Sequence, residues 1–106
     1  MAIASKVYRS AGMKEYADSL KTQSIRAWNW AEANPAVLFR NNTGNTAGLA
    51  AGQQETDDYG RMMAKMKAAA FLYEITGESK YKTWFESNYN NVHLMQWTFA
   101  YPFETD

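Results

Sequence analysis

The sequence lacks cysteine, contains a single histidine, and has no net charge, since lysine plus arginine and aspartate plus glutamate number 11 each. Without cysteine, disulfide frameworks, thiolate metal sites and a cysteine nucleophile are excluded, and a lone histidine cannot form a metal cluster. The charge balance provides no net field for nucleic acid or an anionic membrane surface. We therefore predict no metal or other cofactor, no nucleic-acid partner and no membrane partner.

Long apolar runs are also missing. No stretch approaches the ~20 apolar residues that span a bilayer, and the chain does not open with a charged segment followed by an apolar run, as a signal peptide does. The sequence thus predicts a soluble chain without a signal peptide or transmembrane segment, and it leaves the compartment open. A length of 106 residues corresponds to one small domain at most.

Helical periodicity dominates what is present. Apolar residues recur at i, i+3 and i+4, the spacing of one helix face, and they predict helices at about residues 2–10, 14–33, 57–76 and 79–91. Gly12 and Gly77 end the first and third helices, and Asn34-Pro35 ends the second because a residue before proline avoids the α region. No capping residue precedes the first helix, which indicates a helix cut partway through.

Two segments lack the helical pattern. Residues 36–55 are rich in Asn, Thr and Gly, which predicts a long irregular loop that is either a wall of a binding cleft or simply mobile. In the tail, residues 93–106, large apolar residues alternate with smaller or polar ones, which predicts an extended segment with one buried face.

The two predicted hairpins repeat each other at a constant offset of 65 residues. The aligned pairs are Ala4/Ala69, Val7/Leu72, Tyr8/Tyr73, Gly12/Gly77, Tyr16/Tyr81 and Leu20/Phe85. Chance is the alternative explanation, but the pattern is typical of stacked antiparallel αα-hairpins, and its length exceeds the ~34 residues of tetratricopeptide units. We therefore predict an all-α fold that forms part of an (α/α)6 toroid. Two hairpins leave apolar faces open, so the isolated chain is expected to self-associate.

Two stretches of the chain resemble glycoside hydrolase family 9. Residues 27–35 are similar to a helix of that family ending in Trp-x-Trp-Ala-x-x-Asn-Pro, and residues 57–81 resemble its acidic pair, Ala-Ala-x-x-Leu-Tyr helix and Thr-Gly turn. The resemblance covers most of residues 2–89. It implies an internal fragment of a longer (α/α)6 barrel that hydrolyses β-linked glucan or glucosamine oligosaccharides with inversion.

The chain departs from the family pattern at two places. Asp57-Asp58 stands where the family usually has Asp-Glu, and Met66-Lys67-Ala68-Ala69 stands where it usually has Trp-Ala-Ala. These departures indicate a divergent branch that acts on amino sugars rather than cellulose. Two alternatives stay open: a free-standing helical-repeat interaction module, and a fragment of another (α/α)6 carbohydrate-active enzyme.

No catalytic residue is predicted in the chain. Inverting hydrolysis needs an acid and a base roughly 6.5–9.5 Å apart, and the resemblance places them in an Asp-Ala-Gly-Asp loop and a late Glu that do not occur here. Glu55, Asp57 and Asp58 are the one acidic cluster, which we interpret as a helix cap rather than an acid–base pair. Trp97 and Tyr101 are candidate sugar-stacking residues, with buried packing as the alternative.

Two further tryptophans lie in the second predicted helix. Trp28 and Trp30 are separated by one residue and point to different sides of that helix. We predict that both belong to the hydrophobic core, because large aromatic side chains are usually covered.

Overall fold

The computed structural model describes residues 1–38 and 56–98, all of whose regular elements are helical. The elements are α1 (Ala2–Ser10), α2 (Lys14–Ala33), α3 (Asp58–Thr76), α4 (Ser79–Asn88), the 3-10 helix η2 (Tyr89–Asn91) and α5 (His93–Gln96). The predicted all-α class is confirmed. None of the helices in the described ranges is long and apolar enough to cross a membrane.

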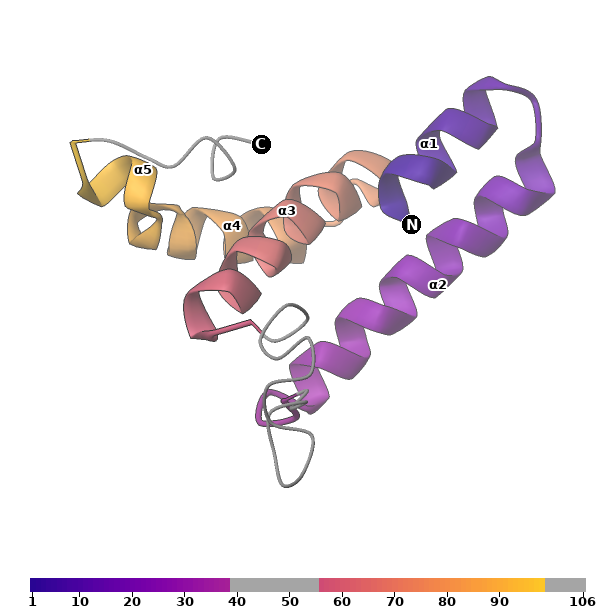
Figure 1. Ribbon diagram of the computed structural model, residues 1–106. Helices are drawn as coiled ribbons and strands as arrows, with labels where there is room; N and C mark the ends of the chain where they lie inside the picture. Colours follow the sequence, from indigo (N-terminus) through magenta and orange to yellow (C-terminus); the bar gives the residue numbers. More distant parts are fainter. Residues whose placement is uncertain (39–55, 99–106) are drawn as a thin grey trace, which may run out of the picture.

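The first hairpin joins α1 to the long helix α2 through a tight turn (Figure 1). Gly12 has a φ of +83°, which glycine adopts without the steric cost that a side chain brings. Inside the hairpin, the buried Ser5 hydroxyl donates to the Ala17 carbonyl at 2.7 Å. At its outer end, the rings of Tyr8 and Tyr16 meet edge to face, with centroids 4.8 Å apart.

The second hairpin, α3 and α4, turns in the same way. Gly77 has a φ of +72°, and its N–H donates to the Tyr73 carbonyl at 2.7 Å, which satisfies an open carbonyl at the end of α3. The Thr76 hydroxyl then accepts the N–H of Glu78 at 3.1 Å. The glycines aligned by the sequence repeat therefore share one left-handed conformation at the ends of α1 and α3.

The core lies where α2 meets the second hairpin. Trp28 points its ring edge-on to Tyr81, at 5.2 Å between centroids, and to Trp84, at 5.6 Å. Ala69 and Leu72 of α3 complete the buried cluster. Ion pairs from Lys6 to Glu74 and from Lys65 to Glu32 also join the two hairpins, but exposed pairs of this kind add little stability.

The structure corrects four details of the predicted organisation. The third helix begins at Asp58, with Asp57 as its N-cap, and α4 ends at Asn88, where η2 tightens the last turn. The extended conformation predicted from residue 93 is wrong for residues 93–96, which form α5. Trp30 is also not a core residue. Most of the predicted loop and tail, residues 39–55 and 99–106, lie outside the described residues.

Exposure separates the two tryptophans of α2. Trp28 is 8% exposed and Trp30 is 57% exposed. Two residues along a helix correspond to about 200° of rotation, so the side that packs on α3 and α4 covers only one of them.

Candidate functional site

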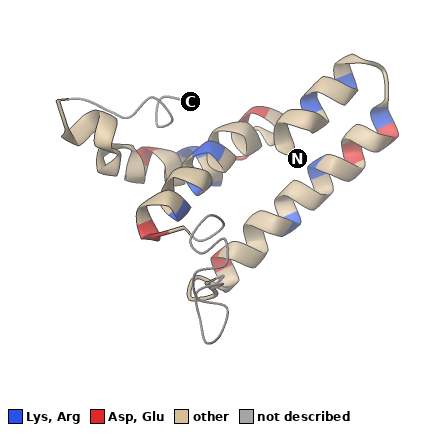
Figure 2. Cartoon of the chain, in the orientation of Figure 1, with Lys and Arg blue, Asp and Glu red and all other residues tan. Residues whose placement is uncertain are grey.

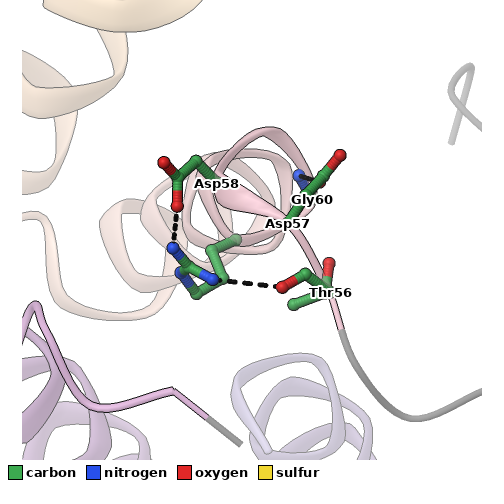
Figure 3. A network of polar contacts seen from close by, with 5 residues as sticks. Thr56, Asp57, Asp58 and Gly60 are labelled. Atoms are coloured by element: carbon green, nitrogen blue, oxygen red, sulfur yellow. Dashed lines mark hydrogen bonds and ion pairs between the residues drawn. The ribbon is translucent and has the colours of Figure 1, made fainter. Parts of the chain in front are cut away.

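The acidic cluster lies at the first turn of α3. Asp57 has extended backbone angles, and its carboxylate accepts the N–H of Gly60 at 2.7 Å, the geometry of an N-cap (Figure 3). A side chain at position 60 would crowd this turn, since a Cβ there would lie 2.0 Å from the Thr56 hydroxyl. The local sequence thus holds the Asp57 carboxylate on the backbone. Glu55 lies outside the described residues.

Asp58 points away from this cap. Its carboxylate pairs with the Arg61 guanidinium, which also donates to the Thr56 carbonyl at 3.1 Å (Figure 3). The Asp58 side chain is nearly fully exposed. The two carboxylates are therefore engaged in different ways, one by the helix backbone and one by an arginine, on an open surface.

An aromatic stack connects this turn to α5. The His93 ring lies flat between Tyr59 and Trp97, with centroid distances of 3.7 and 3.4 Å and interplanar angles of 7° and 10°. The Tyr59 hydroxyl accepts the backbone N–H of His93 at 2.9 Å, which fixes the start of α5. Trp97, a predicted sugar-stacking residue, belongs to this stack and is 43% exposed. Tyr101 lies outside the described residues.

Sequence reasoning missed Tyr59 and His93. They are 34 residues apart, and the only local signal was the spacing of four between His93 and Trp97, which places both on one helix face. The extended conformation predicted for the tail gave no reason to pair them, because residues four apart in a strand lie too far apart along it for their rings to stack.

A separate apolar groove of about 620 Å³ runs between the start of α1, the second half of α2, and α3. Both the buried Trp28 and the exposed Trp30 line it. Among the described residues that line it, the charged side chains are those of Arg61, Lys65 and Lys67. A lining of mostly apolar side chains suits the apolar face of a helix.

Among residues 1–38 and 56–98, no group of three or more His, Cys, Asp or Glu side chains could hold a metal ion. Basic and acidic residues are interspersed along α2, α3 and α4 rather than gathered into one field (Figure 2).

Comparison with known proteins gives one family. The family model of glycosyl hydrolase family 9 matches residues 1–105, nearly the whole chain. No curated protein and no solved structure matches it.

Proposed function

The chain belongs to glycosyl hydrolase family 9, a family of (α/α)6 barrels, and from this membership we propose that it forms two hairpins of an inverting hydrolase. The proposed substrates are β-linked glucan or glucosamine oligosaccharides. The catalytic acid and base are proposed to come from other parts of the enzyme. The observation that carries the proposal is the match over residues 1–105.

The geometry of the two carboxylates at the start of α3 supports a structural role for this segment. Asp57 is held on the Gly60 N–H and Asp58 on Arg61, so neither carboxylate is presented across a cleft from the other. An inverting mechanism needs two carboxyls on opposite sides of the scissile bond, with room for a water molecule between them. The substitutions Met66-Lys67 and Asp58 relative to the family pattern favour an amino-sugar substrate within the proposed class.

The isolated chain is expected to show no hydrolysis of cello-oligosaccharides or chitosan oligosaccharides. The measurement is release of reducing ends at high protein concentration, with the longer enzyme that contains this segment as the positive control. Measurable turnover by the 106-residue chain would contradict the proposal, and its loss in Asp57→Asn or Asp58→Asn would then assign the chemistry to the acidic cluster.

We propose that Trp97 contacts a sugar ring. Stacking on His93, which stacks on Tyr59, holds the indole plane in place, and a flat aromatic face suits the apolar C–H face of a pyranose. Trp97→Ala is expected to weaken oligosaccharide binding by about tenfold or more in calorimetric titration. Trp30→Ala, which removes an exposed tryptophan from another surface, is the matched control. Equal affinities of the wild-type chain and Trp97→Ala would refute this role.

We also propose that the chain self-associates when isolated. Large apolar side chains remain exposed on α1, at the N-cap of α2 and on α2, among them Ile3, Val7, Met13, Tyr16 and Trp30. Large exposed apolar patches are characteristic of protein interfaces rather than of monomers.

A further inference from the structure

Helix α2 carries an apolar face that is exposed in the described part of the chain. Its buried side presents Ala17, Ser24 and Trp28 to the rest of the chain. A second set of residues, next to that side, alternates in steps of three and four, the spacing of a coiled-coil seam. We call these residues the α2 seam: Met13, Tyr16, Leu20, Gln23, Ala27 and Trp30.

The α2 seam is open along most of its length. Met13, Tyr16, Gln23, Ala27 and Trp30 are all exposed, and only Leu20 is half-buried. In Figure 1 the second half of α2 runs clear of α1. Around that half, Ala27 and Trp30 line the apolar groove shared with α3, so the seam leads directly into the groove. A helix laid along the second half of the seam would therefore also contact residues that line the groove.

We propose that the occupant is a second copy of this chain, packed antiparallel along the α2 seam about a two-fold axis at Gln23. Tyr16 and Trp30 each lie seven residues from Gln23 and on the same face. The two-fold axis therefore places Tyr16 of each copy against Trp30 of the other, at the mouth of the groove. Between these aromatic contacts, the two-fold axis brings Ala27 of one copy level with Ser19 of the other. Both side chains are small, which allows the helices to approach closely.

Charge complementarity supports this pairing. Glu15 and Arg26 are eleven residues apart, three turns of helix, so both flank one edge of the seam. Neither forms an ion pair with another side chain in the described ranges. In the antiparallel arrangement Glu15 of one copy lies about 7.5 Å along the axis from Arg26 of the other, within reach of these long side chains. The two-fold axis produces this contact twice, and the seam itself contains no charge.

A self-complementary surface is what a two-fold interface requires, because the same patch must serve both copies. The antiparallel orientation also sets the opposite ends of the two helix dipoles side by side. The inference specifies the self-association proposed above and is independent of the family's chemistry. Its failure would leave the assignment to a hydrolase barrel intact.

Sedimentation velocity of the 106-residue chain over a concentration series tests the location of the interface. A dimer is expected, and Trp30→Ser should raise its dissociation constant by about thirtyfold. Leu94→Ser removes an equally exposed apolar side chain from α5 and should leave the constant unchanged. A chain that stays monomeric at every concentration, or a dimer that Leu94→Ser disrupts and Trp30→Ser does not, overturns the proposal.

A charge exchange tests the orientation without removing packing. Arg26→Glu is expected to weaken the dimer by about fivefold, because it sets two like-charged contacts in place of attractive ones. Adding Glu15→Arg should restore the original affinity. Lys14→Glu reverses a charge on the opposite side of α2 and is the control. Circular dichroism of each variant verifies that α2 remains helical. Arg26→Glu dimers as tight as the wild type, or a double variant weaker than the single one, would exclude the antiparallel pairing.

Discussion

Replacing Trp28 with alanine is expected to lower the free energy of unfolding by about 3–5 kcal/mol, the range for large aromatic truncations in a core. The indole packs against both Tyr81 and Trp84 of α4, and it belongs to the buried cluster with Ala69 and Leu72. The Lys65 ammonium also lies over its ring, at 5.1 Å from the centroid. Because a domain of this size has only about 5–15 kcal/mol in total, the variant should lose most of the contact between its hairpins.

Trp30→Ala is the control for this experiment, since it removes the same side chain from the same helix where it is exposed. Its effect on unfolding should stay within about 0.5 kcal/mol. Urea denaturation followed by circular dichroism, at protein concentrations too low for dimers, measures both variants. Equal destabilisation by the two substitutions would mean that the hairpins are not held together through Trp28.

The sequence predicts the hairpin turns because their causes are local. Gly12 and Gly77 each follow a helical run and occupy left-handed backbone positions that other residues resist. Asn34-Pro35 similarly ends α2 through the steric restriction on the residue before proline. These signals lie within a few residues of the feature they determine, and so they can be interpreted without knowing the packing.

The difference in burial between Trp28 and Trp30 has a non-local cause. Both have the size and apolar character of core residues, and their spacing states only that they face different sides of α2. Which side is covered depends on α3 and α4, which begin 28 or more residues later in the chain. A single sequence offers no measure of that placement, so the prediction that both are buried was wrong for Trp30.

The candidate site shows the same limit. The N-cap at Asp57 accepts the N–H of Gly60, only three residues away. This local sequence is therefore enough to predict the first turn of α3. The stack of Tyr59, His93 and Trp97 joins the beginning of α3 to α5 across 34 residues. The alternation of large apolar residues after residue 93 has the period of a strand. In the structure, the backbone N–H of His93 donates to the Tyr59 hydroxyl, and residues 93–96 form a helical turn instead.

The internal repeat aligns residues that have the same local role and different surroundings. Leu72 and Tyr81 in the second hairpin are buried, because Trp28 of α2 covers them. Their equivalents in the first hairpin, Val7 and Tyr16, are exposed in the described part of the chain. The glycine turn therefore recurs in both hairpins, whereas the burial of the aligned side chains depends on whether a helix of the other hairpin packs against them. The repeat thus provides a pair of tyrosines for comparison at equivalent positions.

Tyr81→Ala is expected to cost about 3–5 kcal/mol of unfolding free energy, since the side chain is 0% exposed and meets the Trp28 ring. Tyr16→Ala, at the aligned position with 49% exposure, should cost about 1 kcal/mol when measured at low protein concentration. Tyr81→Phe keeps the ring contact and should retain most of the stability. Denaturant unfolding of the three variants compares them directly. Similar losses for Tyr81→Ala and Tyr16→Ala would show that the two hairpins stabilise themselves independently. The expected difference in unfolding free energy would instead show that the second hairpin is stabilised by the packing of α2 against it.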